Sequence, residues 1–134
     1  NNLEKLKKEL NLTNEVIFIY KSSEQEKLGL LEKSDLFVMP SVVHKKSVEG
    51  FGITYIEAAS YGKPSIGGIF GGESDAIVEG ETGYLCDGND LSSLYETLLK
   101  TLNDHQYKQL GNNAFKFSQK FRWEKVIKKY IELI

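Results

Sequence analysis

Two glutamates and two glycines lie close together between residues 49 and 57. Gly50 and Gly52 stand between Glu49 and Glu57, and a helix is expected to begin at about Gly52. Glycine has no Cβ, so a ligand can approach the backbone closely there. The first N–H groups of a helix have no partner within it, and the helix dipole favours an anion beside them by roughly 0.3–1 kcal/mol. The spacing therefore predicts an anion site, and a pyrophosphate group would suit it.

The two glutamates flank this predicted anion site. Glu57 falls about one turn into the helix, where its carboxylate can accept hydrogen bonds from both hydroxyls of a ribose. Glu49 precedes the helix, where it can accept hydroxyls of a sugar on the other side of the pyrophosphate. Each charge-assisted hydrogen bond would contribute about 1.5–3 kcal/mol. An ordinary capped helix with glutamates near its start explains the same residues, so at this point both interpretations stay open.

The elements that must position these residues alternate between strands and helices. Apolar, β-rich runs predict buried strands over residues 16–20, 36–39, 64–66 and 84–85. Amphipathic spacing and capping signals predict helices over residues 3–10, 24–33, 52–61, 73–79, 91–102, 104–119 and 122–134. Ser22 or Ser23 is expected to cap the second helix, and Gly62 is expected to end the helix of residues 52–61. Asp90 is expected to cap the helix of residues 91–102.

Such alternation predicts an α/β fold, a Rossmann-like three-layer domain with a parallel sheet covered on both faces. In these folds ligands bind at the carboxyl ends of the strands. Three loops follow such ends, after Tyr20, Met39 and Ile66, and they are rich in serine, glycine, lysine and glutamate. The predicted anion site lies in the second of these loops.

Composition limits the classes of function. The chain has 134 residues, enough for one compact domain, and its net charge of −2 gives no basic field for nucleic acid or an anionic membrane. Its one cysteine, Cys86, has no partner for an internal disulfide and is expected to be a buried, inert thiol. The sequence has no Asp-x-Asp motif, and His44 and His105 lie far apart, so no metal site is expected.

The order of further motifs narrows the interpretation. SDLFVMPS, EGFGITYIEAASYGKPSI, GGESDAIVEGETGYL and the DL and LYETLLKTLND segments follow one another along the chain. From about Val16 to the last helix this order resembles the carboxy-terminal domain of retaining glycosyltransferases of family 4, also called glycosyltransferase group 1. The key motif of that family, two glutamates separated by seven residues, is matched by Glu49 and Glu57. The resemblance implies the second, donor-binding domain of a GT-B fold.

The resemblance also implies a role for individual residues. Glu57 would hold the ribose hydroxyls, and Glu49 would be the catalytic-site carboxylate that contacts the transferred sugar. The remaining implied donor-binding positions are Gly50, the backbone N–H groups of Phe51 and Gly52 at the sugar, Ile53 and Thr54 at the diphosphate, Tyr20 and Lys21 at the base, and Gly71 and Gly72 along the donor cleft. Asp75 stands where the family usually has a glutamate. Because aspartate is one methylene shorter, any contact that this carboxylate makes is expected to be weaker or rearranged.

The resemblance extends to the whole enzyme. The family's Arg/Lys pair for the donor phosphates and its acceptor domain would lie upstream of Asn1, so residues 1–134 are expected to be a donor-binding domain truncated at its N-terminal side. The isolated chain should then bind donor weakly and catalyse little. The expected reaction is metal-independent and needs no cofactor: a glycosyl unit moves from a nucleotide-diphosphate sugar to an acceptor hydroxyl with retention.

Further expectations concern partners and location. The implied partners are a nucleotide sugar and a glycan or lipid-linked acceptor, with no nucleic acid. The implied setting is bacterial surface polysaccharide or lipopolysaccharide synthesis, in the cytoplasm at the inner face of the membrane. Two alternatives stay open: a GT-B-type epimerase or phosphorylase, and a non-enzymatic interaction domain on the same fold. The His44–Lys46 cluster contacts phosphate or acceptor in one interpretation and is a solvated loop in the other.

Overall fold

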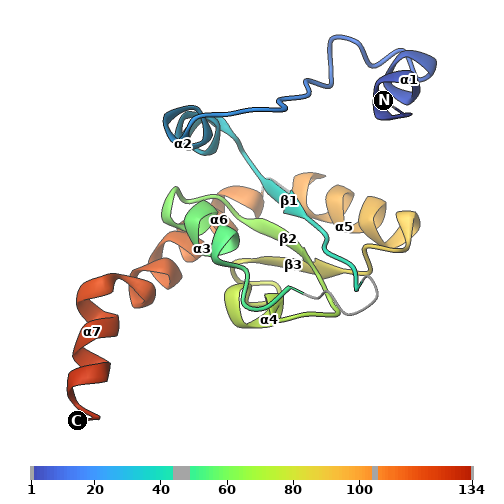
Figure 1. Ribbon diagram of the computed structural model, residues 1–134. Helices are drawn as coiled ribbons and strands as arrows, with labels where there is room; N and C mark the ends of the chain where they lie inside the picture. Colours follow the sequence, from blue (N-terminus) through green and yellow to red (C-terminus); the bar gives the residue numbers. More distant parts are fainter. Residues whose placement is uncertain (1, 44–48, 104–105, 134) are drawn as a thin grey trace.

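A computed structural model describes residues 2–43, 49–103 and 106–133. Seven α-helices, three strands and one short 3-10 helix follow one another within these ranges (Figure 1). They are α1 (Asn2–Glu9), α2 (Glu24–Lys33), β1 (Phe37–Met39), α3 (Ile53–Ser60), β2 (Ser65–Gly68), α4 (Glu73–Ala76), β3 (Gly83–Cys86), α5 (Leu91–Asn103), α6 (Gln106–Ser118), η1 (Gln119–Phe121) and α7 (Trp123–Ile131).

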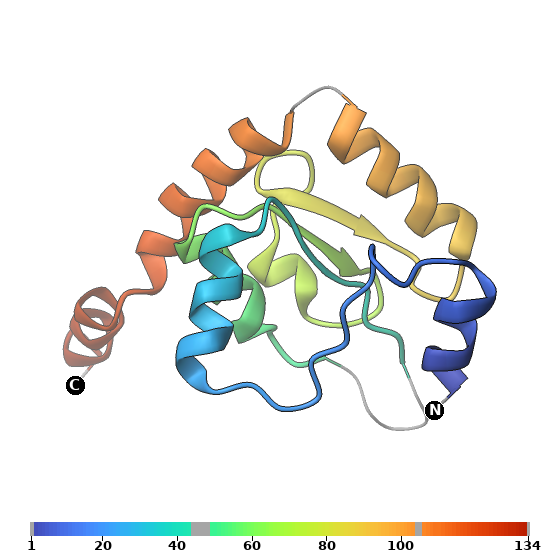
Figure 2. The same ribbon diagram turned by 90° about the horizontal axis from the view of Figure 1, so that it is seen from above.

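The strands form a parallel sheet in the order β1-β2-β3, with Val38 opposite Ile66 and Ile66 opposite Tyr84. Seen from above, α5 and α6 lie on one side of the sheet, and α3 and α4 lie on the other (Figure 2). The predicted three-layer α/β arrangement is therefore confirmed. The core between the sheet and α3–α4 is built on Tyr55, Ala76 and Ile77, which are almost fully buried.

The expected capping signals act where the sequence placed them. Ser23, rather than Ser22, caps α2: its hydroxyl accepts the N–H of Glu26, and the Glu26 carboxylate accepts the Ser23 N–H at 2.7 Å. Gly62 ends α3 in the left-handed conformation, φ +69°, and the N–H of Lys63 donates to the carbonyl of Ala58. Asp90 accepts the N–H of Ser92 at the start of α5. These contacts fix where three helices begin or end.

Helices α3 and α6 approach each other closely at a pair of glycines. A Cβ added to Gly111 would lie 2.2 Å from the carbonyl oxygen of Gly62. No side chain larger than hydrogen fits there without moving backbone, because the contacted atom is itself a backbone atom. The glycine pair thus holds the end of α3 against α6.

The predicted strand over residues 16–20 is wrong. These residues form an extended connection between α1 and α2 and belong to none of the three strands (Figure 1). Ile17 and Tyr20 are 79% and 66% exposed. An apolar β-branched run becomes a strand only when a neighbouring strand shares its hydrogen bonds, and within the described residues β1 pairs only with β2.

Smaller corrections concern the ends of the elements. The predicted helix over residues 73–79 ends at Ala76, because Ile77 adopts an extended backbone conformation. Strand β2 continues past Ile66 to Gly68, which carries the chain farther toward the edge where the predicted site lies. The last helix ends at Ile131 instead of continuing to residue 134, and neither α1 nor α7 contains a buried residue.

Candidate functional site

The helix N-terminus that the sequence predicted is open. Gly52 precedes α3 with φ +80° and ψ 57°, the left-handed region, and no side chain caps the helix. A Cβ at Gly52 would lie 2.3 Å from Cδ2 of Tyr55, so glycine is required both by conformation and by space. The backbone N–H groups at the start of α3, around Ile53 and Thr54, are therefore not covered by a capping side chain. This is the geometry that favours an anion.

The glycine-rich turn after β2 packs against the backbone segment that leads into α3. The N–H of Gly72 donates to the carbonyl of Glu49 at 3.0 Å. A Cβ at Gly72 would lie 1.6 Å from the carbonyl oxygen of Gly50, and a Cβ at Gly71 would lie 2.8 Å from that of Glu49. The predicted glycine pair and the Glu49–Gly50 segment thus meet at the carboxyl edge of the sheet. Their spacing leaves no room for side chains at Gly71 and Gly72.

Tyr55 anchors α3 to the end of β1. Its side chain is fully buried, and its hydroxyl donates to the carbonyl of Met39. Its ring forms a T-shaped pair with Phe37 at a centroid distance of 5.7 Å. Burial raises the pKa of the Tyr55 hydroxyl, which therefore stays a hydrogen-bond donor at neutral pH. This contact fixes the direction in which the first turn of α3 points.

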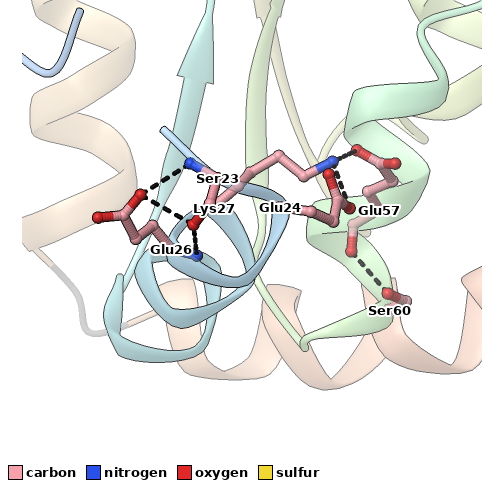
Figure 3. Close-up of polar contacts among 6 residues, drawn as sticks. All are labelled: Ser23, Glu24, Glu26, Lys27, Glu57 and Ser60. Carbon is pink, nitrogen blue, oxygen red and sulfur yellow. Dashed lines mark hydrogen bonds and ion pairs between the residues drawn. The ribbon is translucent and has the colours of Figure 1, made fainter. Parts of the chain in front are cut away.

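Glu57 lies one turn into α3, as predicted, and is held by a residue of α2. Its Oε2 lies 3.4 Å from Nζ of Lys27, which also lies 3.0 Å from Oε1 of Glu24 (Figure 3). The Lys27 and Glu57 side chains are 39% and 40% exposed. The pKa of Lys27 is raised, first by its hydrogen bond to Glu24. Sequence analysis missed Lys27, because the contact joins residues thirty positions apart and leaves no local signal.

A cavity of about 430 Å³ borders this face of α3. It lies between α3, the end of α6 and η1. Its wall includes two residues of the predicted site, Ile53 and Glu57. The remaining lining residues are Ile56, Ser60, Tyr61, Phe115, Ser118, Gln119, Phe121 and Arg122. Glu57 therefore faces both a hollow on the surface and a cation from the neighbouring helix.

A buried carboxylate under the site was also missed. Glu73, which directly follows the glycine pair, is only 1% exposed, and its Oε2 has no hydrogen-bond partner among the described residues. A Cβ added to Gly71 would lie 2.5 Å from this oxygen. The position of an acidic residue immediately after Gly71–Gly72 is the signal that could have drawn attention to it. Asp75, the position expected to carry the acidic contact, is exposed on α4.

The other residues that the sequence singled out lie outside the Glu49–Glu57 segment. Tyr20 and Lys21 are exposed on the connection that leads to α2, and the Tyr20 hydroxyl donates to Glu4 of α1 at 2.8 Å. The His44–Lys46 cluster and His105 lie outside the described residues. Cys86 is buried, as predicted, and burial raises the pKa of its thiol.

Two features are absent from the described residues. In the described ranges no group of three or more histidine, cysteine, aspartate or glutamate side chains is arranged to hold a metal ion. No helix in the same ranges is both long and apolar enough to cross a membrane.

Comparisons with known proteins agree on one group. Residues 1–117 match the family model described as glycosyl transferases group 1. The chain is 32% identical over 127 residues to N-acetyl-alpha-D-glucosaminyl L-malate synthase of Bacillus anthracis. The aligned region covers 93% of this chain and 32% of that protein. It is 29% identical over 132 residues to D-inositol 3-phosphate glycosyltransferase of Corynebacterium urealyticum, which covers 98% of this chain and 30% of that one. The chain therefore spans about a third of the length of the curated relatives it matches.

Solved structures give the same result for the fold. Sucrose-phosphate synthase from Thermosynechococcus elongatus superposes with a TM-score of 0.81 and 29% identity, over 98% of this chain and 32% of that one. HepE of Anabaena, solved with UDP-glucose, superposes with a TM-score of 0.77 at 22% identity, over 99% of this chain and 36% of that one. The family match covers residues 1–117, which include the open N-terminus of α3 and the glycine turn packed against it. The chain is therefore a member of the glycosyl transferases group 1 family.

Proposed function

We propose that this chain is the donor-binding domain of a retaining GT-B glycosyltransferase, which moves a glycosyl unit from a nucleotide-diphosphate sugar to an acceptor hydroxyl. The observation that carries the proposal is the uncapped N-terminus of α3, set on the Glu49–Gly50 and Gly71–Gly72 backbone with Glu57 one turn further on. In this proposal the amides of Ile53 and Thr54 bind the diphosphate, Glu57 accepts the ribose hydroxyls, and Glu49 contacts the transferred sugar.

The chemistry follows from where charge develops. When the bond between sugar and diphosphate breaks, negative charge grows on the departing phosphate oxygen. Backbone N–H groups already fixed at a helix N-terminus stabilise that charge without reorganising, which lowers the barrier. Gly52, held in the left-handed conformation against Tyr55, keeps those groups in place. No side chain of this chain need act as a nucleophile.

Finer details are part of the proposal and have indirect support. Solved structures of similar fold hold UDP and UDP-glucose, which favours a uridine nucleotide as the first probe. The proposed setting, by analogy with the family, is bacterial surface polysaccharide or lipopolysaccharide synthesis, with a glycan or lipid-linked acceptor and cytoplasmic chemistry at the inner membrane face. The proposed transfer uses neither metal nor cofactor.

A nucleotide titration tests the proposal. The chain, isotopically labelled, is titrated with UDP, GDP, ADP and CMP to about 10 mM while backbone amide shifts are followed. The expected result is that one nucleotide shifts the amides of residues 51–57 and that Glu57→Gln weakens the effect. Glu96→Gln on α5, an exposed glutamate far along the chain, is the matched control. No shift with any nucleotide, in this chain and in the full-length protein, would contradict a donor site at α3.

Product analysis of the full-length protein separates the two alternatives. A transferase releases free nucleoside diphosphate and a new glycoside, whereas an epimerase returns an isomerised sugar nucleotide. A non-enzymatic domain would leave activity unchanged in the Glu49→Ala and Glu57→Ala variants.

A further inference from the structure

Lys27 is placed between two carboxylates of different helices. Its ammonium group lies 3.0 Å from Glu24 on its own helix and 3.4 Å from Glu57 on α3 (Figure 3). The Lys27 ion pair uses Oε2 of Glu57. The contact therefore restricts the rotamer of Glu57 from outside its own helix while one of its carboxylate oxygens takes no part in the pair.

The surroundings of Lys27 favour a fixed position for its ammonium group. The Ser23–Glu26 capping box fixes the first turn of α2, which carries both Glu24 and Lys27. Lys27 lines a cavity of about 340 Å³ whose other walls include Leu30, Leu31 and Phe37. A second link between the same parts of the chain, Lys63 Nζ to the carbonyl of Glu32 at 2.9 Å, holds the far end of α2 near the end of α3.

The charge of Lys27 also has a consequence for an anionic ligand. Glu57 lies one turn from the N-terminus of α3, so a diphosphate bound there would be a negative group near a negative carboxylate. An opposite charge beside Glu57 offsets that repulsion. Of the three side chains in the Glu24–Lys27–Glu57 cluster, only Lys27 supplies a positive charge.

We propose that Lys27 is a positioning residue for ribose recognition: its ammonium group holds Oε2 of Glu57 so that Oε1 is presented to the ribose hydroxyls. The inference rests on the proposed function, since it needs Glu57 to be the ribose acceptor. Lys27 acts through Glu57 and makes no contact of its own with the nucleotide. Its effect is therefore confined to ligands that carry ribose hydroxyls.

Ribose selectivity is the measurement that tests this inference. Dissociation constants for UDP and for 2′,3′-dideoxy-UDP are determined by calorimetry with the chain, and with GDP and ADP and their dideoxy forms if UDP does not bind. Lys27→Met keeps the apolar stem and removes the charge. We expect it to weaken UDP binding about threefold to fivefold, the range of a half-exposed ion pair, and to leave dideoxy-UDP binding unchanged. Lys27→Arg should restore UDP binding.

The controls separate this inference from the proposed function. Lys33→Met, an exposed lysine in the last turn of α2, should change neither constant. In the Glu57→Gln background, Lys27→Met should have no further effect. Equal losses for UDP and dideoxy-UDP in Lys27→Met would show that Lys27 contacts base or phosphate directly. Unchanged affinity for both ligands would show an ion pair without a role in binding. Either outcome overturns this inference and leaves the proposed function standing. Absence of nucleotide binding in both the wild-type chain and the full-length protein overturns the proposed function and this inference with it.

Discussion

At the scale of single residues, the candidate site depends on backbone segments that approach more closely than side chains permit. The carbonyl oxygen of Gly50 occupies the space where a Cβ of Gly72 would stand. Because the contacted atom belongs to the backbone, a larger residue at position 72 must displace the Glu49–Gly52 segment itself. The glycine therefore controls the position of the predicted anion site.

Alanine at two glycines should have opposite effects. Gly72→Ala is expected to lower the free energy of unfolding by about 1–3 kcal/mol, because overpacking forces backbone to move. Gly29→Ala, inside α2 with open space around its Cβ position, should raise it by about 0.5–1 kcal/mol, since alanine favours the helix. Urea denaturation of the two variants measures both changes, and a stabilising Gly72→Ala would contradict the close approach.

A second residue-scale prediction concerns the buried carboxylate of Glu73. Glutamine has nearly the same shape and carries no charge, and a buried acceptor without a partner costs about 1–3 kcal/mol. Glu73→Gln is therefore expected to raise the midpoint of thermal unfolding. Asp75→Asn on the same helix, exposed to solvent, should change the free energy of unfolding by less than about 0.5 kcal/mol. Destabilisation by Glu73→Gln would mean that its carboxylate has a partner in the folded chain.

Local spacing predicted part of this site, and long-range contacts decided the rest. The Gly52 turn, the helix that begins beside it and Glu57 one turn later follow from residue types at fixed offsets, so the sequence placed them correctly. Lys27 and Glu73 owe their importance to neighbours supplied by other segments. Nothing in the spacing of residues 24–33 indicates that one of its lysines meets α3.

At the scale of elements, caps were predictable and strand pairing was not. A cap is a contact between residues three positions apart, so the sequence contains all of it, as Ser23 and Glu26 illustrate. A strand forms only by pairing with a second segment, and the apolar pattern of one segment does not identify its partner. Residues 16–20 have the composition of a buried strand, yet Ile17 is largely exposed because no strand of the described sheet pairs with this segment.

The capping box of α2 gives a prediction at this scale. Ser23→Ala removes the side-chain acceptor at the helix start and should destabilise α2 by about 1 kcal/mol, whereas Ser22→Ala should have little effect. Faster hydrogen exchange of the α2 amides is the measurement. Equal exchange in both variants would contradict the assignment of Ser23 as the cap.

The same capping box also depends on pH. The pKa of Glu26 is lowered by the hydrogen bond that its carboxylate accepts from the Ser23 backbone N–H. The stabilisation from that bond is therefore complete above the ordinary pKa of 4.5 and declines as pH falls below it.

At the scale of the whole molecule, burial is concentrated in the middle of the chain. Helices α1 and α7 contain no buried residue, whereas β2 is buried along its whole length and α3 buries Tyr55, Ala58 and Ala59. Figure 1 shows α1 and α7 at the two extremities of the molecule, away from the sheet. The buried hydrophobic residues of the described chain therefore lie mainly in the sheet and in helices α2 to α6.

Cys86 reports on that central body. Its side chain is 2% exposed at the end of β3, and burial raises the pKa of its thiol, so it is both shielded and protonated at neutral pH. Alkylation by iodoacetamide at pH 7.5 is expected to be slow in buffer and to accelerate in urea together with loss of circular dichroism. Rapid alkylation of the native chain would show that β3 opens independently of the rest of the sheet.

The glycine pair that joins α3 to α6 limits how this sequence can vary. The Gly111 contact falls on the carbonyl oxygen of Gly62, an atom that every amino acid at position 62 would also possess. A mutation at position 111 therefore has no compensating mutation at position 62, which itself needs φ +69°. In a randomised library selected only for folding, both positions should return glycine with no covariation between them, a signature of steric demand rather than of ligand binding.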